Sequence, residues 1–396
     1  MTPFCSSLYI HVPFCAGACD YCDFYSVPVK AEDPVMALYV DRLLEDCGYF
    51  LKKYDVSKIA SVYIGGGTPS VLGAALLKKL LDGINKLTME MTTGKNVENY
   101  RNEVTLEVNP ESCDGNLLET VKGSGVTRIS AGVQTFSEKS RLAVNRAGEA
   151  GGLDKKLKLI SEFFPNRFSV DLISGLPFQD EKILLRDIEK ALSFDPGHIS
   201  LYALTLDPCT PLADNIAKGG VSIPSGDSAD NLWLFGRDTL EEAGYAQYEV
   251  SNFCIPGKES CHNLRYWRME NWLGAGPAAS GTVFNDVDGT AQRFTNAADV
   301  DFWLNAKPGT AGENENIDSP DLIKETFLMG FRTVKGPDAG LFYRRFKTNI
   351  ENIIPRTIKK WQSRGLLRTD RIALTGEGLL FLDAFLAEAF AETDGR

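Results

Sequence analysis

Between residues 8 and 204 the sequence alternates, six times, a short apolar run with a longer stretch whose apolar residues recur at helical spacing. An unbroken apolar run predicts a strand buried on both faces, and such strands form parallel sheets covered by helices. The expected strands span residues 8–12, 59–64, 104–108, 128–133, 168–173 and 198–204. The expected helices span residues 34–54, 72–87, 116–122, 138–144, 153–163 and 181–192. The alternation predicts an α/β fold, an open partial (β/α)₆ barrel two units short of a closed eight-stranded barrel.

Polar residues stand near the ends of four of these expected strands. Glu107 and Asn109 end the third strand and Gln134 ends the fourth, while Asp171 and Tyr202 lie on the fifth and sixth. Each residue alone would be explained as a helix cap or a solvated strand end. In a parallel sheet, however, the carboxyl ends of the strands share one edge, where ligands bind. Five polar residues on that edge favour one deep site.

Three cysteines follow the first expected strand. Cys15, Cys19 and Cys22 are spaced i, i+4 and i+7, in a loop that Pro13 and Gly17 mark as tight. Three thiolates in such a loop can hold a [4Fe–4S] cluster and leave one iron free for a small chelating ligand. The alternatives are a structural zinc site, which needs four ligands and usually paired Cys-x-x-Cys units, and three unrelated buried thiols. The spacing favours the cluster.

Charge and hydropathy exclude several classes of partner. A net charge of −11 at pH 7 argues against nonspecific binding to nucleic acid or to anionic lipid. No apolar run approaches the roughly 18 residues that span a bilayer, and the first basic residue is Lys30, so the charged start of a signal peptide is missing. We expect a cytoplasmic protein with no nucleic-acid partner and no stable membrane insertion. In a reducing compartment its clustered cysteines would bind metal.

The second half of the chain divides less clearly. We expect the barrel to occupy residues 1–225, a connecting region 226–307, a polar linker 308–320 rich in turn formers, and a smaller domain 321–396. Helical stretches followed by a short hairpin predict a winged-helix-like C-terminal module, whose acidic surroundings argue against DNA binding.

The cysteine spacing after the first strand resembles the signature of the radical S-adenosylmethionine (SAM) superfamily. Over nearly the whole chain, further segments resemble the oxygen-independent coproporphyrinogen III oxidase group and, within it, the HemW-type heme chaperone branch. The segments that carry this resemblance are Tyr-Ile-His-Val-Pro-Phe-Cys, Gly-Gly-Gly-Thr-Pro-Ser, Glu-Val-Asn-Pro, Gly-Val-Gln-Thr-Phe-Ser, Asn-Arg at 145–146, Asp-Leu-Ile-Ser-Gly-Leu-Pro and His-Asn-Leu-Arg-Tyr-Trp.

The resemblance implies a partial (β/α)₆ barrel that carries SAM and a [4Fe–4S] cluster at its top. Cys15, Cys19 and Cys22 match the cluster ligands. The positions that match the lining of the SAM sites are Tyr9, Tyr21, Gly66, Gly67, Thr68, Glu107, Gln134, Arg146 and Asp171, with Ala203 as a further candidate.

The segment 262–267 resembles one implicated in heme binding in this family. Histidine is a common axial ligand of heme iron, and Tyr266 and Trp267 offer flat apolar surface to a porphyrin. His262 is therefore the expected heme-binding residue. His11, inside the first strand, and His198, at the start of the sixth, are expected to be structural.

Three departures from the family pattern bear on function. The oxidases carry a fourth cysteine where this chain has Phe24, and an N-terminal extension that closes over the substrate, whereas this chain begins eight residues before Tyr9. These departures favour a chaperone that binds heme and passes it to hemoproteins over the alternative, radical decarboxylation of coproporphyrinogen III. The third departure is a histidine that the family places near Ser280 and this chain lacks. A radical enzyme with another small substrate, and a homodimer, both stay open.

Overall fold

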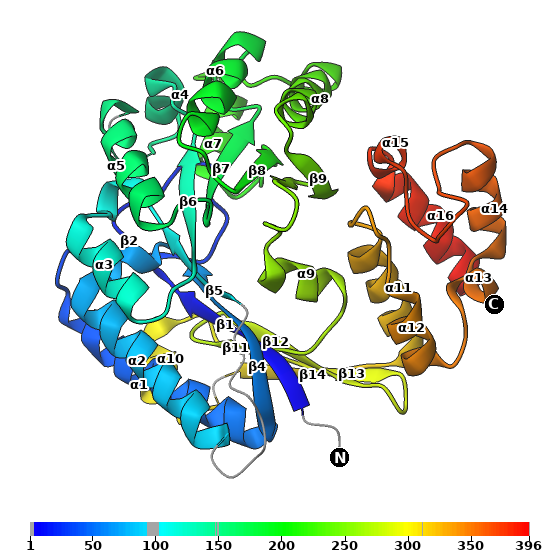
Figure 1. Ribbon diagram of the computed structural model, residues 1–396, viewed down its shortest axis with the longest axis horizontal. Coiled ribbons are helices and arrows are strands. Elements are labelled where there is room, and N and C mark those ends of the chain that lie inside the picture. The colour runs from blue at the N-terminus through cyan, green and yellow to red at the C-terminus, as the bar shows by residue number, and fades with distance from the viewer. Residues whose placement is uncertain (1–3, 93–102, 147, 149, 311, 396) are drawn as a thin grey trace.

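The computed structural model describes residues 4–92, 103–146, 148, 150–310 and 312–395. Six neighbouring parallel strands form the centre of its main sheet, and they confirm the predicted open partial barrel (Figure 1). In spatial order these strands are β1 (Phe4–Val12), β4 (Val56–Gly66), β5 (Glu103–Val108), β6 (Arg128–Gln134), β7 (Phe168–Ser174) and β8 (His198–Ala203).

Helices follow the parallel strands and cover the outer face of the sheet (Figure 1). They are α1 (Pro34–Lys53), α2 (Gly73–Thr92), α3 (Gly115–Gly123), α4 (Glu138–Ala143), α5 (Ala150–Phe163) and α6 (Glu181–Leu192). Their apolar faces and the strands form one core, in which Ile10, Val62, Leu106, Leu43 and Leu80 are fully buried. Burial of continuous apolar strands between two layers is what the sequence pattern predicted.

The sheet extends beyond these six strands on both sides. Beside β1 lies β11 (Trp272–Ala275), also parallel, followed by antiparallel β12 (Ser280–Asn285), β13 (Thr290–Asn296) and β14 (Gly312–Ile317). Beside β8 lie antiparallel β10 (Asn252–Cys254) and β9 (Ala246–Glu249). The twelve strands run in one row from β14 to β9, so the barrel stays open.

One prediction needs correction here. Residues 312–317 of the predicted linker 308–320 form β14, which is paired with β13 along its whole length. Five of its six residues are exposed, because β14 is the edge strand and needs no buried face. The polar composition of this segment therefore reflects a solvated sheet edge.

Further elements accompany the main sheet and its helices. Strands β2 (Phe14–Cys15) and β3 (Val27–Pro28) pair in the cysteine loop. The others are η1 (Pro69–Leu72), η2 (Pro110–Ser112), α7 (Pro211–Ala217), α8 (Asp227–Glu242), α9 (Cys261–Trp267) and α10 (Val300–Asn305). No helix in the described part of the chain combines the length and the apolar character that a membrane crossing requires.

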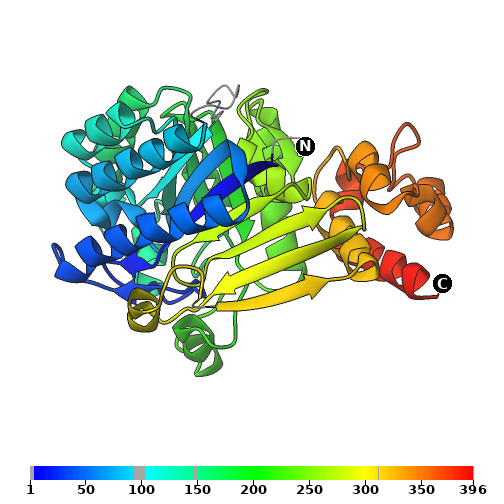
Figure 2. The same ribbon diagram turned by 90° about the horizontal axis from the view of Figure 1, so that it is seen from below.

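The C-terminal helices form a separate lobe beside α9, next to one end of β13 and β14 (Figures 1 and 2). They are α11 (Ser319–Gly330), α12 (Ala339–Phe346), α13 (Ile350–Ile353), α14 (Pro355–Ser363), α15 (Gly376–Leu379) and α16 (Leu382–Asp394). The lobe has its own aromatic core, which includes Phe331, Trp361 and Phe385. The predicted hairpin is reduced to one bridge between Leu367 and Leu374.

Candidate functional site

A cavity of about 420 Å³ opens at the carboxyl ends of the parallel strands. We call it the cysteine cavity, because Cys15, Cys19 and Cys22 all line it. Its volume lies in the range of small-molecule sites. The structure brings together there nine of the other predicted site residues: Tyr21, Gly66, Gly67, Thr68, Glu107, Gln134, Arg146, Asp171 and Ala203. Asn109 and Tyr202 line the same cavity, so all five polar strand-end residues meet at one site.

The cysteine loop is fixed from two sides. The Cys15 thiol lies 3.3 Å from Thr68 Oγ1, at the glycine-rich end of β4. On the other side, the Asp20 amide donates a 2.9 Å hydrogen bond to Val144 O, and Asn145 Nδ2 donates one of 3.0 Å to Ala18 O. Both contacts come from the segment after α4. The loop is therefore held at the rim of the cavity by two elements far apart in sequence.

Arg146 is the cation of the cysteine cavity. Its Nη1 donates to Cys19 Sγ at 3.5 Å, and its Nη2 donates to Asn109 Oδ1 at 2.7 Å and to Gly132 O. Burial raises the pKa values of Cys15 and Cys22 and so disfavours their thiolates, while the charge of Arg146 acts in the opposite direction on Cys15. The guanidinium therefore partly offsets the effect of burial at Cys15 and contacts Cys19 directly. Asn109 orients this guanidinium. The strand pattern predicted Asn109 only as a polar residue at a strand end, and its place in the Glu-Val-Asn-Pro segment was the sequence signal for a role in the site.

Glu107 is a carboxyl group held beneath the glycine-rich turn. Its Oε1 accepts a 2.7 Å hydrogen bond from Tyr63 OH, and its Oε2 accepts one of 3.1 Å from the Gly66 amide. Burial raises the pKa of Glu107 to about 7; nearby Asp171 adds to this, and Tyr63, the Gly66 amide and Arg128 oppose it. Tyr63 was missed by the sequence analysis, since nothing in the pattern of β4 marked its hydroxyl.

The glycine-rich turn is required by close packing. A Cβ at Gly65 would lie 2.8 Å from the Glu107 carboxyl, and one at Gly67 would lie 2.7 Å from Phe14 O. Gly66 has a φ of +112°, which side chains rarely adopt. The turn therefore presents bare backbone to the cavity.

Asp171 is the second buried carboxyl group of the cavity. It accepts hydrogen bonds from Ser200 Oγ at 2.7 Å and Ser130 Oγ at 3.0 Å, and burial raises its pKa above the ordinary value. Among the described residues no cation forms an ion pair with this carboxyl group, although the charges of Arg128 and Arg146 oppose the effect of burial on its pKa. Glu107 and Asp171 are thus two oriented acceptors for hydroxyl or ammonium groups of a ligand.

Two predicted residues, Tyr9 and His262, lie outside the cysteine cavity. Tyr9 OH is hydrogen-bonded to His11 Nδ1 at 2.9 Å, below the cavity. His262 is 1% exposed, and both its ring nitrogens are engaged, Nδ1 with Ser61 Oγ and Nε2 with Tyr266 OH, each at 2.9 Å. Burial lowers the pKa of His262 to about 3. The structure therefore does not support His262 as a ligand of heme iron. The short helix α9 directs the His262 ring into the floor of the barrel, and the sequence of this seven-residue helix does not show that direction.

The donor set of the cysteine cavity fits an iron–sulfur cluster with a polar ligand beside it. Three thiols, a guanidinium, two carboxyl groups and bare glycine backbone surround one space. Among the described side chains, no three of His, Cys, Asp or Glu gather around one point as a single metal ion requires. The fit to a cluster therefore rests on the type and placement of the donors. Phe24, which stands where the oxidases have a fourth cysteine, is 69% exposed at the cavity mouth.

Comparisons with known proteins agree with this architecture. Residues 9–191 match the Radical SAM superfamily and residues 317–381 the HemN C-terminal domain. The chain is 33% identical to the heme chaperone HemW of Lactococcus lactis, over 94% of each chain, and 31% identical to that of Escherichia coli, over 98% of each. Among solved structures it resembles the E. coli coproporphyrinogen III oxidase HemN, with a TM-score of 0.78 and 18% identity, over 98% of this chain and 90% of that one. At that identity the likeness shows the fold alone.

Proposed function

Because the chain belongs to the HemW family of radical SAM proteins, we propose that it is a heme chaperone: it holds a [4Fe–4S] cluster and SAM in the cysteine cavity, binds heme, and passes it to acceptor hemoproteins. The observation that carries the proposal is the meeting of Cys15, Cys19 and Cys22 with the polar strand-end residues around one cavity. Residues spread over nearly 190 positions of sequence gather there.

In this proposal the chain's own residues divide the work. Cys15, Cys19 and Cys22 hold the cluster, and Arg146 orients the loop of Cys19. Glu107 and Asp171 accept hydrogen bonds from the amino group and ribose hydroxyls of SAM, and the backbone of Gly66 and Gly67 lies against it. When bound, a cluster with SAM supplies one-electron chemistry at a carbon–sulfur bond.

For the heme we propose the mouth of the cysteine cavity. Phe24 and Tyr202 are large side chains that stay exposed there, and flat aromatic surface suits a porphyrin. This placement does not use His262, which is buried and fully hydrogen-bonded.

The test is to reconstitute the cluster without oxygen and to measure SAM binding, heme binding and heme transfer to an apo-globin as the acceptor. We expect heme to bind and to appear in the globin. Failure to bind heme would contradict the proposal.

A parallel incubation with coproporphyrinogen III, SAM and a reductant tests the oxidase alternative. We expect no protoporphyrinogen IX, because Phe24 replaces the fourth cysteine of the oxidases. Formation of protoporphyrinogen IX together with 5′-deoxyadenosine would assign the chain to the oxidases instead.

A further inference from the structure

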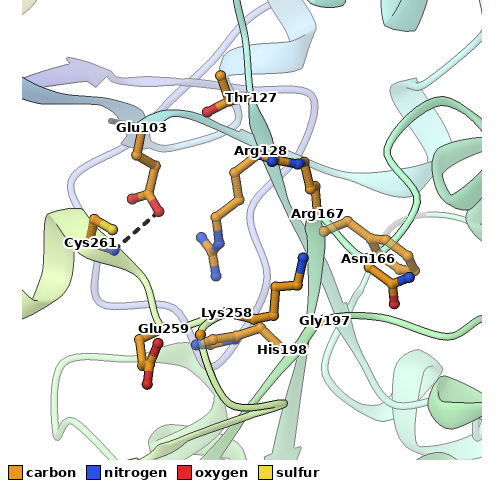
Figure 3. Close-up of a pocket in the computed structure, with 12 residues that line it drawn as sticks. Glu103, Thr127, Arg128, Asn166, Arg167, Gly197, His198, Lys258, Glu259 and Cys261 are labelled. Atoms are coloured by element: carbon orange, nitrogen blue, oxygen red, sulfur yellow. Dashed lines mark hydrogen bonds between the residues drawn. The ribbon is translucent and has the colours of Figure 1, made fainter. Parts of the chain in front are cut away.

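A second cavity, of about 170 Å³, lies at the opposite end of the parallel strands. Figure 3 shows residues that line it. We call it the arginine cavity. Its walls include the first residues of four neighbouring strands, namely Glu103 of β5, Arg128 of β6, Phe168 of β7 and His198 of β8. The loop before α9 closes it with Lys258 and Glu259. Nothing in the proposed function uses this cavity.

Arg128 is the central group of the arginine cavity. Its side chain is 8% exposed, and Figure 3 shows its guanidinium directed into the middle of the cavity. Within the described part of the chain, none of its N–H groups has a hydrogen-bond acceptor. Burial works against its charge, but nearby Glu103, Tyr63 and Tyr248 raise the pKa of Arg128 overall, so it stays charged. A buried guanidinium without hydrogen bonds is costly unless a ligand or water supplies the acceptors.

The nearest carboxylate is already committed elsewhere. Glu103 Oε2 accepts from the Cys261 amide at 3.1 Å, and its Oε1 accepts from the His262 amide at 3.0 Å and from Ser260 Oγ at 3.5 Å. Figure 3 shows this carboxylate turned toward Cys261. Glu103 therefore fixes the start of α9 and makes no hydrogen bond to Arg128 within the described chain.

His198 is a neutral ring in the wall of the same cavity. Tyr248 Oη accepts from the Ser260 amide at 3.3 Å and is hydrogen-bonded to His198 Nε2 at 2.8 Å. Burial, followed by Arg128, lowers the pKa of His198 well below its ordinary value, so the ring is neutral. His198 therefore adds no positive charge to the cavity and leaves Arg128 as its central cation.

The charges around the cavity point to the class of ligand. Three cations line it, Arg128, Arg167 and Lys258, and none of them has a hydrogen-bond or ion-pair partner among the described residues. Two carboxylates also line it, Glu103 and Glu259, so one positive charge is in excess. A site built from donors and cations requires an acceptor with negative charge, and guanidinium groups match oxyanions. The volume admits a small polyatomic anion with water.

We propose that the arginine cavity is a binding site for a phosphate group, either inorganic phosphate or a phosphomonoester. Three cationic side chains can each donate to a different oxygen of a phosphate group, whereas a monocarboxylate offers only two oxygens. Arg128 supplies the least exposed of these donors, and Arg167 and Lys258 supply further positive charge.

The test is calorimetric titration of the full chain at constant ionic strength, with inorganic phosphate, glycerol 3-phosphate and propionate in separate arms. We expect one saturable site for at least one phosphate ligand, and the tighter of the two identifies the source. Arg128→Gln and Lys258→Ala should each weaken that binding about tenfold to a hundredfold, since each removes charge-assisted hydrogen bonds. Lys359→Ala, an exposed lysine on α14, is the matched control and should bind as the parent does.

Glu259→Gln is a second test, in which phosphate binding should become tighter. Its result does not depend on whether the Arg128→Gln variant folds. Removing this like charge should tighten phosphate binding by up to about fivefold. Absence of saturable phosphate binding, propionate binding as tight as phosphate, or phosphate affinity that is the same in Lys258→Ala and Glu259→Gln as in the parent would overturn the proposal. The readout needs neither cluster, SAM nor heme, so it stands apart from the test of the chaperone function.

Discussion

The ring of Tyr63 packs against the imidazole of His262, with 5.1 Å between the ring centroids. Tyr63 also donates to Glu107, so a single side chain connects α9 with the cysteine cavity. His262 therefore helps to position Tyr63, and through Tyr63 the Glu107 carboxyl group, from the floor of the barrel.

His262→Ala should lower the free energy of unfolding by about 2–4 kcal/mol, because it removes two buried hydrogen bonds and leaves a cavity. Heme affinity of the folded variant, followed by the absorbance of bound heme, should stay within about twofold of the parent. Tyr266→Phe keeps the ring, frees Nε2, and should cost only about 1 kcal/mol. A variant of His262 with normal stability and lost heme binding would restore it as a heme ligand.

Changing Cys15, Cys19 and Cys22 together to Ala should abolish the iron–sulfur absorbance and the paramagnetic signal of anaerobically reconstituted, reduced protein. These thiols are the three that face the cysteine cavity. Cys209→Ala, which removes an exposed thiol elsewhere, is the control and should keep full cluster content. A four-iron signal retained in the triple variant would show that the cluster is held elsewhere.

SAM affinity should depend on pH through Glu107. Its carboxyl is protonated below a pKa of about 7, and only the ionised form accepts strong hydrogen bonds from both ammonium and hydroxyl groups. Raising the pH from 6 to 8 should therefore tighten SAM binding by up to about tenfold. Equilibrium dialysis across this range measures it. Glu107→Gln should flatten the profile, and an unchanged profile in that variant would assign the dependence to another group.

Phe24→Ala should weaken heme binding by about twofold to tenfold without loss of stability, because the ring is exposed at the mouth of the cysteine cavity. Val287→Ala, on the exposed turn between β12 and β13, removes a similarly exposed apolar side chain far from the mouth and serves as control. Equal heme affinity in both variants would move the heme away from Phe24.

Asp46→Ala should destabilise the junction between α1 and α10 by about 3–5 kcal/mol. The buried Asp46 carboxylate accepts from Arg42 Nη1 at 3.1 Å, Trp303 Nε1 at 3.2 Å and the Gly309 amide at 3.3 Å. Asp41→Ala breaks only the exposed pair with Lys79 and should cost less than about 1 kcal/mol. Urea denaturation at equilibrium compares the two, and similar midpoints would contradict the role of Asp46.

The sequence predicted the parts of the fold whose pattern is simple. Continuous apolar runs such as the one ending at Val12 marked the six central parallel strands, and Glu107, Gln134 and Asp171 followed the rule that ligands gather at strand ends. It did not predict β11 to β14, because β11 has only four residues, polar residues interrupt β12 and β13, and β14 is almost entirely polar.

The sequence also did not predict features that depend on how the elements are placed relative to one another in the fold. The identity of His262 favoured a ligand, whereas its burial depends on the direction in which α9 enters the barrel. The arginine cavity was equally hidden, since Glu103, Arg128 and His198 are separated by up to 95 positions and meet only because each begins a neighbouring strand.

Strand β6 begins with Arg128 in one cavity and ends with Gln134 in the other. Six steps of about 3.3 Å separate the two residues, so β6 extends roughly 20 Å from Arg128 to Gln134, and Ser130 and Gly132 between them also line the cysteine cavity. Adding or deleting a single residue within β6 would turn the side chains beyond that point to the opposite face of the sheet. An insertion in this strand would therefore disturb the placement of the two cavities relative to each other.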